Sequence, residues 1–258
     1  MYDIHCHILP DIDDGADDIN DSRQLCTIAV NQGINTIIAT PHFVENEMES
    51  DKNEVIEKTS LLNEDCIKRD VSLTILTGME IYFSPNIVEL YEKGVLLTLN
   101  NTKYILIELP MYSQLPPYFE DVIFHLKIKG LIPVLAHPER YKCVIEEPNL
   151  VCDFIESGCV IQVNCGSIDG MFGKTVQKTA HTLLKHNMVH IIASDNHSIS
   201  KRVSFLGNTF NTVSEKYGHG FTDNLFINNP LKIIKGETIE TGKAVKIKKN
   251  LFKFWHVK

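Results

Sequence analysis

Short apolar runs alternate with segments of helical periodicity along this chain, and that alternation restricts its fold more than any other feature. Runs rich in β-branched and aliphatic residues, which are typical of strands, lie at 2–6, 35–40, 72–78, 104–109, 131–136, 159–164 and 189–193. Several of them are apolar almost throughout, as parallel strands covered by helices on both faces should be. Seven βα units without a break in composition predict one α/β domain over 1–258, folded as a distorted (β/α)7 TIM-like barrel. A doubly wound open sheet is the alternative.

The segments between these runs predict amphipathic helices, because apolar side chains recur on one face of each. The two clearest faces are formed by Val55, Thr59, Leu62 and Cys66, and by Val176, Ala180, Leu183 and Leu184. The region 203–258 begins with another apolar-periodic helix, through Phe205 to Val213. We expect this region to supply closing helices at the bottom or side of the barrel, followed by a basic tail.

The basic tail combines lysines with large apolar side chains. It contains Lys243, Lys246, Lys248, Lys249, Lys253 and Lys258, interleaved with Leu251, Phe252, Phe254 and Trp255. We expect a solvated terminal segment, and contact with an acidic partner or a membrane surface is the alternative.

The composition limits where the protein works and what it binds. A net charge of -8 argues against a general nucleic-acid surface, which needs a basic patch. The seven cysteines form no Cys-x-x-Cys pair and sit mostly inside apolar runs, so we expect buried thiols of a reducing compartment. No apolar run approaches the roughly 18 residues of a membrane span, and the opening Tyr2-Asp3 is unlike a signal peptide. We therefore expect a cytoplasmic protein without membrane insertion.

Side chains that bind metals follow most of the predicted strands. His5 and His7 share one face of the first strand, because alternate side chains of a strand point the same way. In a barrel the C-terminal strand ends meet at one mouth. Each residue alone could be a core histidine or a capping aspartate, but their recurrence at successive strand ends favours one metal site. The predicted ligands are His5, His7, Asp14, His42, Glu80, Glu108, His137, Asp195 and His197.

This donor set predicts metal-assisted phosphoester hydrolysis. Imidazole and carboxylate without thiolate suit Mn²⁺, Fe²⁺, Zn²⁺, Co²⁺ or Mg²⁺, in a cluster of two or three ions, and bridging carboxylates favour Mn²⁺. Such clusters bind phosphate oxygens and generate hydroxide at neutral pH for in-line attack on phosphorus. Arg140 and Arg202 follow His137 and His197 closely enough to clamp the phosphoryl group. A surface salt bridge is the alternative role for each arginine.

Three other catalytic patterns are incomplete or missing. The stretch Gly170–Thr175 follows a strand and opens a helix like a phosphate-binding loop, but the first glycine of that motif would fall at Ile168. No cysteine is followed six residues later by arginine, which excludes the usual thiolate-based tyrosine phosphatase motif. The sequence also lacks the Gly-x-Ser-x-Gly elbow of serine hydrolases. Any phosphatase activity must therefore depend on metals.

Several motifs resemble those of a known family. They are Asp3-Ile4-His5-Cys6-His7, Asp13-Asp14-Gly15-Ala16, Ala39-Thr40-Pro41-His42, Gly78-Met79-Glu80, His137-Pro138-Glu139-Arg140-Tyr141 and Ala193-Ser194-Asp195-Asn196-His197. The chain resembles the polymerase and histidinol phosphatase (PHP) superfamily. Within it, the chain most resembles the manganese-dependent tyrosine-protein phosphatases of bacterial capsule and exopolysaccharide loci. The resemblance covers nearly the whole chain and weakens after residue 205.

The resemblance implies a barrel with a trinuclear Mn²⁺ centre and two phosphate-binding arginines, Arg140 and Arg202. Asn196 stands where the family usually has a small residue. The implied ligand groups are His5, His7, Glu80 and Asp195 for one ion, Glu80, Glu108 and His137 for a second, and Asp14, His42 and His197 for a third.

The implied substrate is phosphotyrosine in a protein, in particular the tail of a membrane-anchored tyrosine autokinase that controls polysaccharide synthesis. A PHP phosphatase acting on a small phosphomonoester such as histidinol phosphate is the second reading. A PHP nuclease is disfavoured by the acidic net charge. A regulatory scaffold that binds a phosphoprotein without turnover is the non-enzyme alternative. The resemblance also permits homo-oligomers, although the sequence contains no interface motif.

Overall fold

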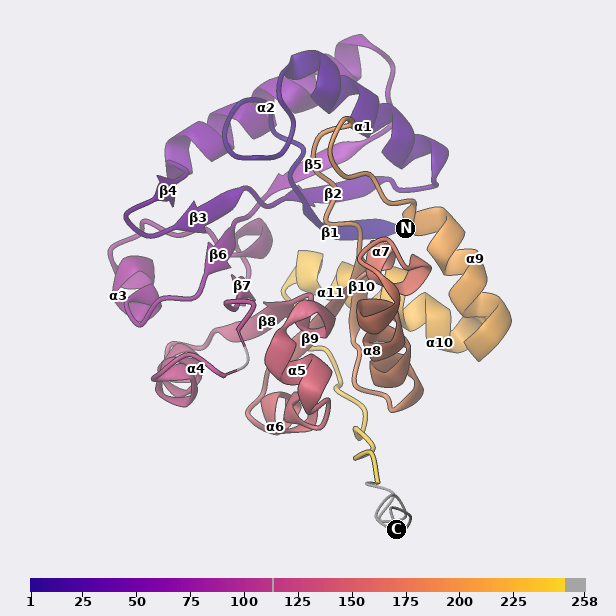
Figure 1. Cartoon of the computed structure of the whole chain (residues 1–258). Helices are drawn as coiled ribbons and strands as arrows, with labels where there is room; N and C mark the ends of the chain where they lie inside the picture. Colours follow the sequence, from indigo (N-terminus) through magenta and orange to yellow (C-terminus); the bar gives the residue numbers. More distant parts are fainter. Residues whose placement is uncertain (113, 249–258) are drawn as a thin grey trace, which may run out of the picture.

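In the computed structural model, which describes residues 1–112 and 114–248, the strands form two sheets around the molecular core (Figure 1). The smaller sheet contains three parallel strands in the order β1-β2-β5, namely β1 (Tyr2–Cys6), β2 (Thr36–Ala39) and β5 (Thr74–Thr77). The larger sheet has the order β10-β9-β8-β7-β6-β3-β4, and only β3 and β4 pair antiparallel. Its strands are β3 (His42–Val44), β4 (Met48–Glu49), β6 (Glu80–Tyr82), β7 (Tyr104–Glu108), β8 (Ile132–Ala136), β9 (Val160–Asn164) and β10 (Ile191–Ala193).

The two sheets together make the expected distorted (β/α)7 barrel, and the doubly wound alternative is wrong. At one seam the chain after β10 lies beside β1, because the Asp195 amide donates to the His5 carbonyl at 2.9 Å and the His7 amide donates to the Asn196 carbonyl at 2.8 Å. At the other seam two short links carry the chain from the smaller sheet to the larger one, between β2 and β3 and between β5 and β6. The ladder is interrupted at both seams, so the barrel is not strictly closed.

The second seam differs from the sequence prediction, because the runs 35–40 and 72–78 each continue into a further short strand. Gly78 explains the break: a Cβ there would lie 2.9 Å from Ile38 Cγ2 and 3.3 Å from the Ala39 carbonyl oxygen. Only a residue without a side chain allows the two chains to approach this closely. The new strands pair with His42 opposite Glu80, which places two predicted ligands next to each other.

Helices cover the outside of the strands, as the parallel sheet requires. Figure 1 shows α1 and α2 over the three-stranded sheet. Asp18 caps α1 and Asp51 caps α2, each accepting two backbone N–H bonds. The α-helices are α1 (Ile19–Asn31), α2 (Lys52–Lys68), α3 (Ile87–Glu92), α4 (Phe119–Ile128), α5 (Lys142–Glu146), α6 (Leu150–Glu156), α7 (Cys165–Asp169), α8 (Lys174–Lys185), α9 (Leu206–Tyr217), α10 (His219–Asp223) and α11 (Asn229–Lys235). Three short turns of other helix types complete the set: η1 (Leu99–Asn101), η2 (Pro138–Arg140) and η3 (Asn224–Asn228).

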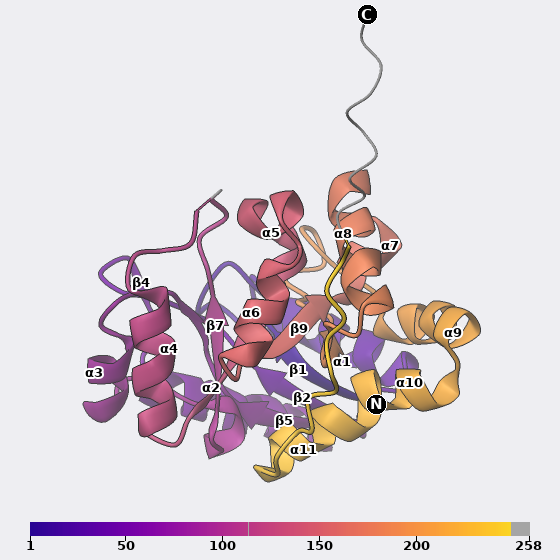
Figure 2. The same ribbon diagram turned by 90° about the horizontal axis from the view of Figure 1, so that it is seen from below.

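The predicted helical faces are buried. Val55, Thr59, Leu62 and Cys66 form the buried face of α2, and Ala180, Leu183 and Leu184 are buried on α8, where Val176 is half-buried. Inside the barrel a separate apolar cluster includes Ile4, Ile38 and Val134 together with Ile233 of α11. Helix α11 therefore fills the end of the barrel opposite the strand C-termini (Figure 2).

A strap, residues 237–248, follows α11 and runs along the outside of the barrel past α6 and α8 (Figure 2). The Val245 amide donates to the His186 carbonyl at 2.9 Å, and the Ile247 amide donates to Asn149 Oδ1 at 2.8 Å. The strap is thus bonded to the barrel through its backbone, while Lys243, Lys246 and Lys248 stay exposed to solvent, as expected for the basic tail. The other tail residues, Lys249, Lys253, Lys258, Leu251, Phe252, Phe254 and Trp255, lie outside the described residues.

Two expectations from composition can be compared with the structure. All seven cysteines are buried free thiols, as predicted. Within residues 1–112 and 114–248, the structure contains no helix with the length and hydropathy that crossing a membrane requires.

Candidate metal centre

The structure brings all nine predicted ligands together at the C-terminal strand ends. His5 and His7 point the same way from β1, with their Nε2 atoms 3.2 Å apart, and both side chains are fully buried. Glu80, at the start of β6, lies at the centre of the cluster. Its Oε2 is 3.1 Å from His5 Nε2, 3.2 Å from His7 Nε2 and 3.2 Å from His42 Nδ1, and its Oε1 is 3.0 Å from His137 Nε2.

The remaining ligands surround this centre. Asp195 Oδ1 lies 3.5 Å from His5 Nε2, and Glu108 Oε1 lies 3.6 Å from His137 Nε2. Asp14 is the outermost residue, with a side chain 54% exposed. Its Oδ1 is 3.3 Å from His197 Nε2 and 3.5 Å from His42 Nε2.

Three groups of side chains could each hold one ion. Within each group, the donor atoms lie within 4.8 Å of one another. The groups are His5, His7, Glu80 and Asp195; His42, Glu80 and Glu108; and His7, Asp14, His42 and His197. The first group has the four members that the family resemblance implies. The second group contains His42 where the resemblance implies His137, and the third group contains His7 in addition to the three implied members.

Two of these residues leave their strands in a backbone conformation that side chains rarely adopt. His137 follows β8 with φ of 34°, and Asp195 follows β10 with φ of 52°. A left-handed conformation costs a residue with a side chain roughly 1–3 kcal/mol and is concentrated at functional sites. Here it turns both side chains back toward the common centre.

The hydrogen bonds around His5 and His7 orient both rings for metal binding. His5 Nδ1 donates to Gln162 Oε1 at 2.9 Å, and His7 Nδ1 donates to Asp13 Oδ2 at 2.7 Å. In the neutral rings both Nε2 atoms are therefore acceptors, and they face the carboxylate oxygens of Glu80 and Asp195. Imidazole and carboxylate acceptors that converge in this way fit divalent cations.

The electrostatics of the carboxylates lead to the same conclusion. Burial opposes ionisation of Glu80, yet His5 and His42 hold its pKa well below the usual range. Burial also opposes ionisation of Asp195, but His5 and Arg202 lower its pKa. Glu108 behaves differently, because burial and the charges of Glu80 and Asp195 raise its pKa to about 8. The carboxylates thus differ in their readiness to ionise, and the like-charge repulsion that raises the pKa of Glu108 is one that bound cations would relieve.

Both predicted phosphate-binding arginines lie at the edge of this cluster. Arg140 Nη1 is 3.3 Å from Asp195 Oδ2, and Arg202 Nη2 is 2.7 Å from Asp195 Oδ1. About a fifth of each arginine side chain remains exposed. The two guanidinium groups therefore flank one buried carboxylate and can reach a ligand that enters from solvent.

Sequence reasoning missed the residues that orient the ligands. Asp13 belongs to the Asp13-Asp14-Gly15 run, yet only Asp14 was assigned a role. In β9, Gln162 Nε2 donates to Asn164 Oδ1 at 2.8 Å, and Asn164 Nδ2 donates to Asp195 Oδ2 at 2.5 Å. Two polar residues at alternate positions of an otherwise apolar strand were the available signal, because such residues share the inward face.

Cys6 lies between two predicted ligands but takes no part in the cluster. Its Sγ is 3.7 Å from the Asn196 carbonyl oxygen and packs in the outer core. The side chain points away from the imidazoles of His5 and His7, as expected from the alternation of a strand.

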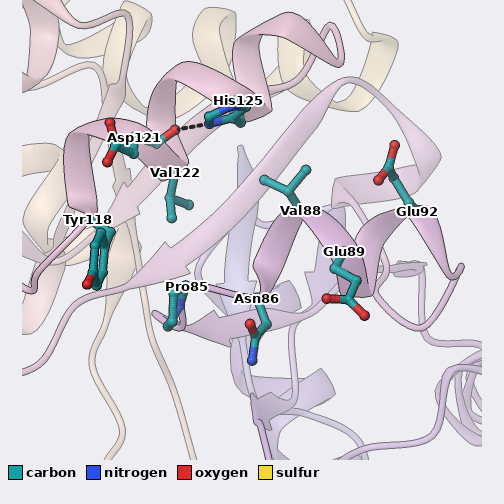
Figure 3. A pocket seen from close by; sticks show the side chains of 9 residues that line it. All are labelled: Pro85, Asn86, Val88, Glu89, Glu92, Tyr118, Asp121, Val122 and His125. Carbon is teal, nitrogen blue, oxygen red and sulfur yellow. Dashed lines mark hydrogen bonds between the residues drawn. The ribbon is translucent and has the colours of Figure 1, made fainter.

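A separate pocket between α3 and α4 contains none of the predicted site residues (Figure 3). Its two glutamates are already paired, Glu89 with Lys93 and Glu92 with Lys129. His125 Nδ1 lies 2.7 Å from the Asp121 carbonyl oxygen, the contact drawn in Figure 3.

Comparison with known proteins places this site among related ones. The chain is 43% identical over 202 residues to the tyrosine-protein phosphatase YwqE of Bacillus subtilis, covering 78% of this chain and 79% of that protein. It is 32% identical over 249 residues to the tyrosine-protein phosphatase CpsB of Streptococcus pneumoniae, covering 93% of this chain and all of that protein.

Solved structures give the same relationship. A chain from the crystal structures of YwqE from Bacillus subtilis and CpsB from Streptococcus pneumoniae, described as unique metal-dependent tyrosine phosphatases, superposes with a TM-score of 0.92 at 37% identity. The match covers 96% of this chain and all of that one. A histidinol phosphate phosphatase from Lactococcus lactis shares the fold alone, with a TM-score of 0.52 at 13% identity, over 84% of this chain and 93% of that one. The family model for capsular polysaccharide synthesis, CpsB/CapC, matches residues 1–235, and the chain therefore belongs to the CpsB/CapC family.

Proposed function

We propose that this chain is a metal-dependent protein-tyrosine phosphatase that acts in the cytoplasm on a tyrosine-phosphorylated protein of capsule or exopolysaccharide synthesis. The observation that carries the proposal is the convergence of nine imidazole and carboxylate side chains on one mouth, with Arg140 and Arg202 on the two oxygens of Asp195. The names of YwqE and CpsB support the reaction class. The family resemblance supports a membrane-associated tyrosine autokinase as the phosphoprotein.

In this proposal the nine predicted residues are metal ligands, and Mn²⁺ is the resident metal at three positions. Four carboxylates in the set favour such a hard cation over a thiophilic one. His5, His7, Glu80 and Asp195 would hold one ion. His137 would join Glu80 and Glu108 at a second, and Asp14, His42 and His197 would complete a third. When bound, the cations supply positive charge that polarises the phosphoryl oxygens and lowers the pKa of water.

The protein's own contribution is to bind and orient the phosphoryl group. Arg140 and Arg202 are permanently charged and carry planar N–H donors that match phosphate oxygens in pairs. The leaving group of phosphotyrosine is a phenolate with a pKa of about 10, so the reaction needs less help from a general acid than cleavage of an alkyl ester. The half-exposed position of Asp14 leaves the outer side of the centre accessible to a protein segment.

The test is phosphate release from a phosphotyrosyl peptide, with metal analysis of the same preparation. We expect His5→Ala and His137→Ala to keep the fold by circular dichroism and to lose activity, and a strong chelator to have the same effect on the unaltered protein. His125→Ala, which changes an exposed histidine of the pocket in Figure 3, is the matched control and should retain activity. Unchanged turnover in His137→Ala or after chelation would contradict the proposal. Faster turnover of histidinol phosphate than of the peptide would reassign the substrate.

A further inference from the structure

The turn Gly170–Gly173 joins α7 to α8 beside the metal centre, and its sequence resembles a phosphate-binding loop. Both glycines adopt φ of 89°, in the left-handed region that favours glycine. The Met171 amide donates to the Gly166 carbonyl at 2.8 Å, and the Gly173 amide donates to the Gly170 carbonyl at 3.0 Å. The Gly170 amide donates to the Ser167 carbonyl at 3.3 Å. Because these amides already have partners, the turn cannot wrap a phosphate in the way such a loop does.

The turn instead presents the ring of Phe172 to both arginines of the site. The guanidinium carbon of Arg140 lies 4.6 Å from the ring centre, and that of Arg202 lies 5.7 Å from it. Gly166 lies next to the ring, since a Cβ at that position would be 3.4 Å from Phe172 Cε2. Among the residues that the structure describes, no other aromatic ring has either guanidinium group over it.

This contact holds the arginines without using the groups that bind phosphate. A guanidinium on an aromatic ring interacts through its face, so the N–H groups at its edge stay free to donate. Arg140 makes one side-chain hydrogen bond in the described structure, from Nη1 to Asp195, which leaves four of its five N–H groups for a ligand. Arg202 has fewer donors left, because its Nε donates to the Asp195 carbonyl at 3.1 Å and its Nη2 to Asp195 Oδ1 at 2.7 Å, which leaves Nη1 for a ligand in the described structure.

We infer that Phe172 is a positioning residue for phosphate binding, which fixes the spacing and tilt of Arg140 and Arg202 so that both guanidinium groups face one phosphoryl group. The inference rests on the proposed phosphatase function. It extends that function to a residue that acts through the two arginines.

The test measures binding of inorganic phosphate to the metal-loaded protein by calorimetry, which does not depend on turnover. Phe172→Leu removes the aromatic face, and we expect it to weaken phosphate binding roughly 5- to 30-fold, the range that an aromatic contact with a partly buried cation contributes. Phe172→Tyr keeps the face and should bind within twofold of the unaltered protein. Phe172→Met serves in place of the leucine variant if that variant does not fold. Metal content should be the same in all of them.

Two controls separate positioning from a general effect on the fold. Met171→Ala changes the neighbouring, exposed residue of the same turn, and we expect it to leave phosphate binding unchanged. In a protein that carries Arg140→Ala and Arg202→Ala, the further change Phe172→Leu should alter binding by less than twofold, because its effect passes through the arginines.

The inference is overturned if Phe172→Leu binds phosphate as tightly as the unaltered protein, if Phe172→Tyr is as weak as Phe172→Leu, or if the effect persists without the arginines. A protein that binds phosphate as described but releases none from a phosphotyrosyl peptide would defeat the proposed function and leave this inference standing.

Discussion

Asp13 offers the sharpest test of how the metal centre is held in place. Its Oδ2 accepts hydrogen bonds from His7 Nδ1 at 2.7 Å and from the His42 amide at 3.0 Å. Its Oδ1 accepts one from the Gly15 amide at 2.9 Å, and the side chain is fully buried. Asp13→Asn replaces one of these oxygens by an NH₂ group. Because both oxygens of Asp13 accept hydrogen bonds, the new NH₂ group must then face at least one buried N–H group that has lost its acceptor.

The size of the effect follows from these contacts. A buried donor that loses its partner costs about 1–3 kcal/mol, so we expect the free energy of unfolding of the metal-free protein to fall by that amount. Residues that orient a metal-bound histidine typically contribute roughly 10- to 100-fold to metal affinity. We therefore expect Asp13→Asn to bind Mn²⁺ about 10- to 100-fold more weakly. Asp13→Ala should lose more stability, since it leaves all three donors unpaired.

The assay combines two measurements on the same preparation. Urea unfolding of the metal-free protein gives the change in stability, and competition with a coloured chelator gives the metal affinity. Asp17→Asn is the matched control, because Asp17 is 59% exposed and pairs only with Lys201 among the described residues, so both readouts should stay unchanged. If Asp13→Asn bound Mn²⁺ within threefold of the unaltered protein, the argument that Asp13 orients His7 would be wrong.

Three further predictions concern other parts of the molecule. Glu80→Gln should retain fewer ions per chain by elemental analysis, since Glu80 belongs to two of the three donor groups, and a full metal complement would contradict that role. Burial lowers the pKa of His190 to about 4, below its usual 6.5, so the folded state loses stability as the pH falls through the unfolded-state value. Between pH 7 and pH 5 the unaltered protein should lose about 2 kcal/mol more than His190→Gln in urea unfolding, and equal losses would exclude the assignment. Gly15→Ala should destabilise the protein by about 1–3 kcal/mol in the same assay, because its Cβ would lie 2.3 Å from the His7 carbonyl oxygen, and an unchanged midpoint would show that the chain relaxes there.

The barrel and the convergence of the ligands could be predicted because both depend on local patterns. Apolar runs of strand length indicate buried parallel strands, and the C-terminal ends of such strands meet whatever the details of the loops. The breaks after β2 and β5 depend instead on the approach of Gly78 to Ile38, which are 40 positions apart in the chain. The hydrophobic periodicity of a sequence does not predict such a contact. The roles of Asp13 and Gln162 were hidden for the same reason, since a hydrogen bond to a ligand is a tertiary contact.

The path of residues 237–248 could also not be predicted from sequence patterns. Lysines among apolar residues indicated a solvated tail, and Lys243, Lys246 and Lys248 are exposed. Nothing in the composition indicated that residues 237–248 form a strap whose backbone is bonded to His186 and Asn149. Composition describes what a segment can tolerate, whereas its path depends on which backbone groups of the barrel remain available.

The burial of all seven thiols has a consequence for how the proposed enzyme would tolerate peroxide. Enzymes that attack phosphorus through sulfur stop working when that sulfur is oxidised, and they need a reductant to recover. The mouth described above is lined by imidazole, carboxylate and guanidinium groups, none of which enters that sequence of oxidation states. Loss of activity through cysteine oxidation is therefore not expected of the proposed enzyme, and a thiol reductant should make no difference to its recovery from peroxide.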